Sequence, residues 1–316
     1  MSTTDSRAED LTRRQAWVIA ARPQTLPAAA APVVVGVGLA LREGVFAPVP
    51  AAAALLGAAL IQIGTNFAND YYDAVKGADT ADREGFTRVT AGGLIEPPSV
   101  KRAMWLTFAA AVLVGVYLVA VGGVPILVIG LLSVASGVAY TGGPYPLGYH
   151  GLGDVFVFVF FGLVAVSGTY YVQAAAELGV AFTTVVPRAE LVPLIALVAA
   201  IPVAALSTNI LVVNNVRDRE EDATTGKRTL AVRFGYAFAR GEYVVLLGAA
   251  YTVPVVVAVT TGDLPTLLPL VTLPYGALVA RTVLTETSGE ALNPALESTG
   301  KLLAAFSALF AVGLVV

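Results

Sequence analysis

The sequence predicts an all-α, polytopic integral membrane bundle of nine transmembrane helices, and three observations lead to this fold class. Of its 316 residues, 57% are hydrophobic and only 13% are charged, whereas soluble proteins carry roughly 25% charged residues. Apolar stretches of about 20 residues, long enough to cross a bilayer, recur along the whole chain. Basic residues are concentrated between alternate stretches. A soluble enzyme is therefore excluded.

Nine apolar stretches bounded by charged residues, Gly or Pro are the expected membrane helices. They cover residues 25–42, 49–69, 103–121, 124–141, 154–174, 190–213, 241–261, 264–280 and 300–316. Residues 1–24 form an N-terminal segment whose polar, acidic beginning, MSTTDSRAED, is not that of a cleaved signal peptide. We expect residues 25–316 to form a single domain.

Local features mark individual helices in order along the chain. Arg22 leads into the first helix, the second ends in an acidic segment, and the third is rich in Ala, Leu and Gly. The fourth ends at Tyr140 before a Gly-Gly-Pro turn, and the fifth begins at Asp154. The sequence VFVFVFFGLVAV of the fifth resembles a buried strand locally, but its length and setting predict a helix. The sixth ends in a second acidic segment, and the last three are continuous apolar runs.

The distribution of basic residues predicts the orientation in the membrane. With nine crossings, only Arg42 and Arg188 fall on one side, and the remaining 17 of the 19 Lys and Arg residues fall on the other. Short basic loops stay on the cytoplasmic side. We therefore expect a plasma-membrane protein whose N-terminus is cytoplasmic and whose C-terminus lies outside.

Composition also excludes several kinds of site. The formal charge is −3 and no basic tract could neutralise a run of phosphates, so nucleic acid is not an expected partner. The chain has no Cys, which excludes disulfides, thiolate metal sites and Cys nucleophiles. Its single histidine, His150, cannot build a multi-histidine metal site. No obligate protein partner is evident.

Two expected cytoplasmic loops, 70–102 and 214–240, are unusually polar where the second and sixth helices end. Each helix ends in one amide and two carboxylates that fall within about 60° of one another around the helix axis. These residues are Asn66, Asp70 and Asp73 in the first, and Asn215, Asp218 and Asp222 in the second. Polar and charged residues are common at helix ends, so either loop alone would not indicate a function. The same pattern in both loops favours a binding or catalytic site.

The chemistry of these carboxylates suggests a ligand. Each would cost roughly 2.5–3.5 kcal/mol in lipid, so they must face a wet cavity or one another. Facing carboxylates repel unless a cation neutralises them, and oxygen ligands without Cys or His suit Mg²⁺. Magnesium often completes its coordination with water and substrate phosphates, which suggests a diphosphate. Arg88, Lys227 and Arg228 could hold its remaining oxygens.

These loops resemble those of the UbiA superfamily of intramembrane prenyltransferases, whose signature is two Asp-rich motifs at cytoplasmic helix ends. Further segments are similar to the branch that uses 1,4-dihydroxy-2-naphthoate in menaquinone synthesis. They are RPQTLP (22–27), QIGTN (62–66), TRVT (87–90), YTGGPYPLGY (140–149), GTYY (168–171) and GKRTL (226–230). One departure is Gly77, which stands where the common first motif has another Asp, and Asp79 follows two residues later.

The resemblance implies a nine-helix bundle around a central lipid-facing cavity. There, Mg²⁺ and a polyprenyl diphosphate would meet an aromatic acceptor, and the allylic cation would alkylate 1,4-dihydroxy-2-naphthoate with loss of CO₂ to give demethylmenaquinone. The resemblance and the chemistry of the residues together give the expected roles. The expected metal ligands are Asp70, Asp73, Asp218 and Asp222, with Arg88 and Tyr140 as further catalytic residues. The expected substrate-binding residues are Arg22, Asn66, Asn69, Asn215, Lys227 and Arg228.

Several alternatives remain open at this stage. Tyr140 could equally be an interfacial tyrosine, Asp154 a helix cap or a base, and His150 a solvated loop residue. Another member of the superfamily could use 4-hydroxybenzoate, homogentisate or geranylgeranylglyceryl phosphate as acceptor. A secondary transporter would also carry intramembrane carboxylates, although its site usually lies near the bilayer midplane. The isoprenoid chain length and the oligomeric state do not follow from the sequence.

Overall fold

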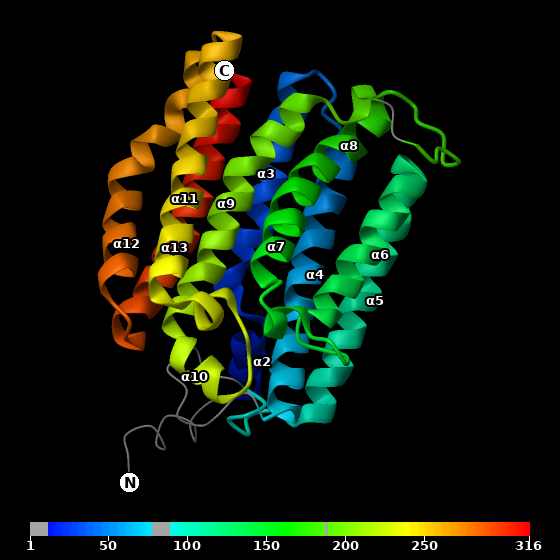
Figure 1. Ribbon diagram of the computed structural model, residues 1–316. Coiled ribbons are helices and arrows are strands. Elements are labelled where there is room, and N and C mark those ends of the chain that lie inside the picture. Colours follow the sequence, from blue (N-terminus) through cyan, green and yellow to red (C-terminus); the bar gives the residue numbers. More distant parts are fainter. Residues whose placement is uncertain (1–11, 78–88, 187–188) are drawn as a thin grey trace.

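The computed structural model describes residues 12–77, 89–186 and 189–316, and every regular element in these ranges is a helix (Figure 1). Nine apolar helical segments run side by side through this part of the chain. They are α3 (Leu26–Arg42), α4 (Pro48–Val75), α5 (Pro97–Gly122), α6 (Val124–Ala139), α7–η3–α8 (Gly153–Glu177), α9 (Leu194–Arg217), α11 (Leu230–Thr261), η5–α12 (Leu264–Thr285) and α13 (Gly289–Val315). Eight are long enough to cross a membrane, when α3 is counted with the α2 and η1 helices before it (Arg13–Arg42), and α6 is shorter. The predicted nine-helix membrane fold is confirmed.

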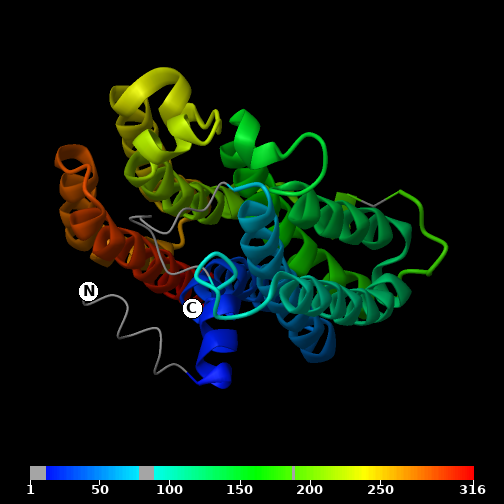
Figure 2. The ribbon, with the colours of Figure 1, turned by 90° about the horizontal axis from the view of Figure 1, so that it is seen from below.

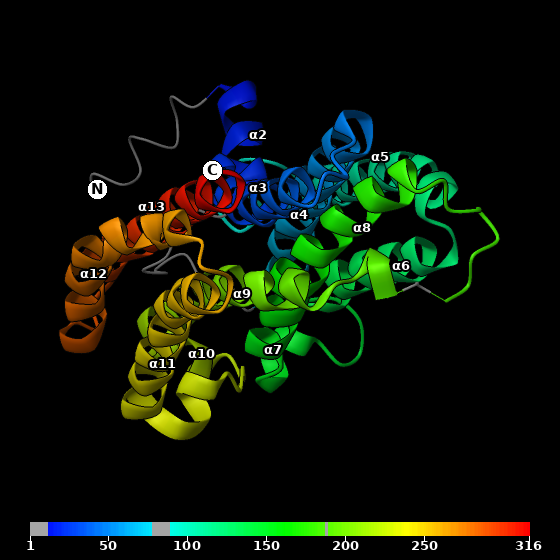
Figure 3. The same ribbon diagram turned by 90° about the horizontal axis from the view of Figure 1, so that it is seen from above.

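Short helices supplement this bundle. They are α2 (Arg13–Ala21), η1 (Pro23–Thr25), η2 (Leu147–His150), η4 (Ala189–Leu191) and α10 (Arg219–Thr224). Helices α2 and α10 lie at the same end of the bundle, which we call the α10 end, whereas the C-terminus lies at the opposite end (Figure 1). Figure 2 views the bundle from the α10 end and Figure 3 from the other.

Two helices, α11 and α13, begin about three turns before their predicted ranges. Helix α11 begins at Leu230, where the Thr229 side chain accepts a hydrogen bond from the Val232 amide, and it bends at Gly235. Gly235 has a φ of 83°, which glycine adopts without strain. Helix α13 likewise begins before its apolar part, at Gly289. Hydrophobicity predicts only the segment in lipid, so it misses polar turns that extend a helix beyond the membrane.

The fifth membrane helix differs from the prediction in its winding. Its Val- and Phe-rich stretch forms a π-helix, η3 (Phe158–Val164), between α7 (Gly153–Val157) and α8 (Ala165–Glu177). Within η3, a Cβ added to Gly162 would lie 2.0 Å from the Cβ of Ala204 on α9. This glycine allows the backbones of η3 and α9 to approach closely. The prediction of a helix is right, but periodicity did not predict its π-helical winding.

The core is built around α3 and α9. Helix α3 packs against α4, α8, α9 and α13, and α9 also packs against α11 and η3. Fully buried Val35, Leu39, Val203 and Phe306 belong to one continuous apolar cluster. A second cluster joins α2 to α4 and α5. This second cluster fixes α2, and therefore the chain that follows it, beside the acidic end of α4.

Candidate active site

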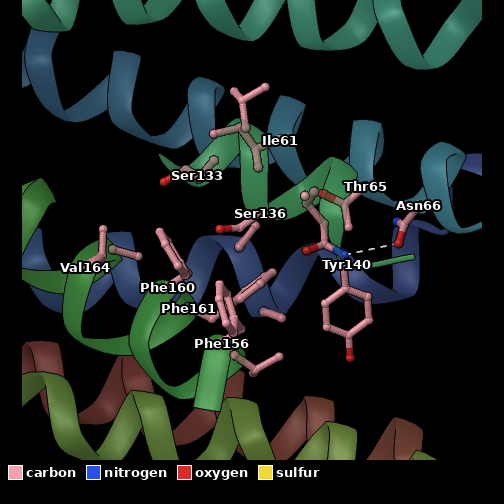
Figure 4. A pocket seen from close by; sticks show the side chains of 18 of the residues that line it. Ile61, Thr65, Asn66, Ser133, Ser136, Tyr140, Phe156, Phe160, Phe161 and Val164 are labelled. Carbon is pink, nitrogen blue, oxygen red and sulfur yellow. Dashed lines mark hydrogen bonds between the residues drawn. The ribbon is translucent and has the colours of Figure 1, made fainter. Parts of the chain in front are cut away.

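A cavity of about 1230 Å³ runs among the helices. Its wall is apolar over most of its length, with side chains from α3, α4, α5, α6, η3 and α8. In Figure 4 the rings of Phe156, Phe160 and Phe161 lie together on this wall, with Tyr140 and Asn66 toward one side of the view. Polar and charged residues from the ends of α4 and α9 line the same cavity, so it joins an apolar chamber to a charged end.

The end of α4 contributes the first polar group. Asn66, Asn69 and Asp73 line the cavity. Asp73 is buried, and its Oδ1 accepts a 2.7 Å hydrogen bond from the Tyr149 hydroxyl. Asp70 lies behind this wall, where its Oδ2 accepts a 3.2 Å hydrogen bond from Thr90. These contacts hold the two carboxylates on adjacent turns of one helix.

The second polar group comes from α9, α10 and the loop after α10. Asn215, Asp218, Asp222 and Lys227 all line the cavity. The Lys227 ammonium lies 3.5 Å from Asp222 Oδ1. The acidic ends of the second and sixth membrane helices therefore meet in one chamber.

Tyr149 on η2 lies between the two polar groups. Its hydroxyl donates to Asp73, while the ammonium groups of Lys76 and Lys227 lie 5.1 and 5.2 Å from its ring centroid. Both distances suit cation–π contacts. Burial lowers the pKa of Lys76, and the carboxylate of Asp73 opposes this shift. Tyr149 thus connects Asp73 to Lys227 across the site.

Arg217 is the main site residue that the sequence reasoning missed. Its side chain is only 2% exposed, and its Nε and Nη2 donate to Oδ1 and Oδ2 of Asp218 at 2.6 and 2.9 Å. Nη1 donates to Asn293 on α13, and Nη2 also donates to Asn214. The sequence showed Arg217 only as one basic residue of a cytoplasmic loop. In the structure it fixes Asp218 to α9 and α13.

The remaining predicted site residues differ in whether they line the cavity. Arg22 and Tyr140 line the cavity. The Arg228 side chain is exposed and is absent from the described cavity wall, although its backbone amide donates to the Tyr149 carbonyl. Arg88 and Asp79 lie outside the described residues.

Two residues whose roles the sequence left open have defined contacts. The Asp154 carboxylate is buried and accepts a 3.3 Å hydrogen bond from Asn215, which joins α7 to α9. His150 stacks on Tyr145, and its Nδ1 lies 2.8 Å from the Pro146 carbonyl. The contacts of Asp154 and His150 are thus with neighbouring segments of the chain.

The charged end has the donor atoms that a hard divalent cation prefers. No group of three or more His, Cys, Asp or Glu side chains within the described ranges is close enough to hold a metal by itself. Mg²⁺, however, usually takes one or two carboxylates and completes its shell with water and substrate phosphates. The buried Oδ1 of Asp70 lacks a hydrogen-bond partner among the described residues. These carboxylates therefore fit Mg²⁺ only together with a phosphate-bearing ligand.

Comparison with known proteins gives a consistent result. Residues 29–311 match the UbiA prenyltransferase family. The chain is 38% identical over 313 residues to the 1,4-dihydroxy-2-naphthoate octaprenyltransferase of Escherichia coli, covering 97% of each chain. It is 38% identical to the enzyme of the same name from Mycobacterium leprae, covering 90% of each chain.

A solved structure with similar architecture is a UbiA homolog from Archaeoglobus fulgidus bound to DMAPP and Mg²⁺. The TM-score is 0.58 at 15% identity, and the alignment covers 94% of this chain and 99% of that one. At this identity the likeness establishes the fold alone.

Proposed function

The chain belongs to the UbiA prenyltransferase family, and from this we propose that it transfers a polyprenyl group from polyprenyl diphosphate to 1,4-dihydroxy-2-naphthoate. The acceptor loses its carboxylate as CO₂, and the product is demethylmenaquinol, the hydroquinone form of demethylmenaquinone. One observation supports this most strongly: Asp73, Asp218 and Asp222 line the same cavity as the apolar wall of α5, α6 and η3. A prenyl diphosphate needs both environments at once.

The charged end binds the diphosphate in this mechanism. Asp70, Asp73, Asp218 and Asp222 would hold Mg²⁺, and the ion would supply positive charge to stabilise the diphosphate leaving group. Lys227 and Arg22, both on the cavity wall, donate to diphosphate oxygens. Tyr140, Asn69 and Asn215 lie on the same wall and complete the proposed polar site.

The apolar chamber controls the fate of the carbocation. The isoprenoid chain lies against its aliphatic and aromatic wall, where the rings of Phe156, Phe160 and Phe161 face a developing cation. Water is excluded there, so the cation reacts with the acceptor ring instead of being hydrolysed. A new C–C bond forms at the ring, the diphosphate leaves with the C–O electron pair, and the ring releases CO₂ and becomes aromatic again.

We propose that the α10 end faces the cytoplasm and that the protein lies in the plasma membrane. Among the described residues, α2, α10 and the loop after α10, all of which carry basic residues, lie at this end (Figure 1), as the positive-inside rule predicts for the cytoplasmic side. Segment 1–24 and loops 70–102 and 214–240 are cytoplasmic in this arrangement. A secondary transporter is disfavoured, because the carboxylates lie at helix ends and not at the bilayer midplane.

The purified protein in lipid nanodiscs is the test of this function. Supplied with Mg²⁺ and labelled polyprenyl diphosphate, it should prenylate 1,4-dihydroxy-2-naphthoate with release of one CO₂ for each product. The same assay with 4-hydroxybenzoate and homogentisate should give at least a hundredfold lower kcat/KM. A higher kcat/KM with either of these acceptors would overturn the assignment of the naphthoate. Solute uptake into proteoliposomes without prenylated product would instead favour a transporter.

Tyr149→Phe should lower kcat/KM for the prenyl diphosphate about 10- to 100-fold. The change removes the hydrogen bond to Asp73 but keeps the ring beside Lys76 and Lys227, and a hydrogen bond to a charged group contributes about 1.5–3 kcal/mol. Steady-state kinetics provide the measurement. Tyr145→Phe is the matched control, because its side chain is exposed and stacks on His150. Equal kcat/KM values for Tyr149→Phe and Tyr145→Phe would show that the Tyr149 hydroxyl does not contribute to the reaction.

A further inference from the structure

Gln62 carries a buried polar atom that the mechanism above does not use. Its side chain is 8% exposed and lines the cavity from α4. Its carbonyl oxygen, Oε1, has no hydrogen-bond partner among the described residues. An unsatisfied buried acceptor costs about 1–3 kcal/mol, so a donor from the cavity would stabilise it.

The hydrogen bonds around Gln62 determine which of its amide atoms remains unpaired. Asn66 Nδ2 donates to the Ala21 carbonyl at 2.9 Å, so Asn66 must present its oxygen to Gln62. Gln62 Nε2 donates to that oxygen at 3.3 Å and to Thr25 Oγ1 at 3.0 Å. The Thr25 hydroxyl accepts this bond because its own proton goes to the Arg22 carbonyl. Rotating the Gln62 amide would place two acceptors face to face, so Oε1 is the unpaired atom.

The position of Gln62 favours a ring over a diphosphate as its ligand. It precedes Asp73 by 11 residues on the same helix, which is about 16 Å along the helix axis at 1.5 Å per residue. The diphosphate binds at the carboxylate end in the proposed function. Gln62 can only accept a hydrogen bond at Oε1, so it suits a neutral hydroxyl and would repel a phosphate oxygen.

We propose that Gln62 Oε1 accepts a hydrogen bond from a hydroxyl of the aromatic acceptor and selects acceptors that carry it. This inference rests on the proposed function. In 1,4-dihydroxy-2-naphthoate the 1-hydroxyl lies beside the carboxylate and donates to it within the molecule. The 4-hydroxyl has no such partner and is therefore the donor to Gln62.

Two acceptors and two variants test this contact. The dissociation constants of 1,4-dihydroxy-2-naphthoate and of 1-hydroxy-2-naphthoate, which lacks the 4-hydroxyl, are measured on the full chain in nanodiscs. Wild type should bind the dihydroxy compound about tenfold more tightly, because its analogue leaves Oε1 unpaired. In Gln62→Met, which keeps the length of the side chain without its amide, the ratio should fall to near one. KM for the prenyl diphosphate should stay within twofold.

Gln24→Met is the matched control, because Gln24 is an exposed residue at the cavity wall and should leave the wild-type ratio intact. Equal binding of the two naphthoates by wild type would overturn the inference even if Gln62→Met fails to fold. An unchanged ratio in folded Gln62→Met would also overturn it. In either case normal prenylation of 1,4-dihydroxy-2-naphthoate by wild type would leave the proposed function standing. Absence of that reaction in wild type would contradict the function itself.

Discussion

Replacing Asp73 with Asn should reduce prenyl transfer about a thousandfold while the protein still folds and inserts. Asn keeps the size of the side chain and an oxygen that can accept from Tyr149, but it removes the negative charge from a buried position on the cavity wall. Metal-assisted charge stabilisation is worth several kcal/mol, and each 1.36 kcal/mol changes the rate tenfold. Asp222→Asn on the opposite wall should have a similar effect.

The measurement is kcat at increasing Mg²⁺ concentration with labelled prenyl diphosphate. If Asp73 helps hold the metal, the Mg²⁺ concentration for half-maximal rate should rise in the variant, and a chelator should abolish wild-type activity until Mg²⁺ is restored. Glu220→Gln is the matched control, because it removes an acidic charge from α10 where the side chain is 74% exposed. Wild-type rates and an unchanged Mg²⁺ requirement in Asp73→Asn would exclude Asp73 as a ligand.

The sequence predicts the membrane fold well because burial in lipid demands long apolar segments. Helix α3, for example, was expected at 25–42 and spans Leu26–Arg42. The helix boundaries are predicted least well where part of a helix extends beyond the lipid into water. Charged residues interrupt the starts of both helices, Arg233 and Arg240 in α11 and Glu290 and Glu297 in α13, so hydropathy alone could not assign these turns to the membrane helices that they begin.

The carboxylates of the site could also be predicted, since acidic residues are costly in a membrane and stand out in an apolar chain. Their partners could not. Arg217 is the last residue of α9, and no local pattern distinguishes an arginine directed at the core from one directed at water. Gln62 is a single polar residue within an apolar helix, and its importance appears only when Ala21 and Thr25 are brought beside Asn66.

Asn66 illustrates the same limit. The sequence predicts it to bind substrate, and the residue does line the cavity. Its amide hydrogens, however, donate to the Ala21 carbonyl and to Thr25. These bonds hold the turn that carries Arg22 against α4. Helical periodicity places Asn66 on the right face, but only tertiary contacts reveal how its donors are used.

Arg217→Met should lower the free energy of unfolding by about 3–5 kcal/mol, because it leaves the buried Asp218 carboxylate without its partner. The contacts to Asn214 and Asn293 are lost as well, so α9 and α13 are less firmly connected. Thermal unfolding in detergent, with denaturant titration, gives the measurement. Arg219→Met is the control. It removes an ion pair with exposed Glu220, a hydrogen bond to the Ala231 carbonyl and a contact with the Tyr236 ring, but it leaves no buried carboxylate without a partner, so its loss of stability should be smaller.

The double variant Arg217→Met/Asp218→Leu separates stability from function. Replacing both members of a buried ion pair with apolar residues is often neutral or stabilising, so the double variant should recover most of the stability lost in Arg217→Met. It should remain inactive, because Asp218 no longer supplies a carboxylate to the cavity. If the double variant regained activity with its stability, Asp218 would be a structural partner of Arg217 and not a metal ligand. If Arg217→Met were as stable as Arg219→Met, the buried pair would not be what holds α9 to α13 at the site.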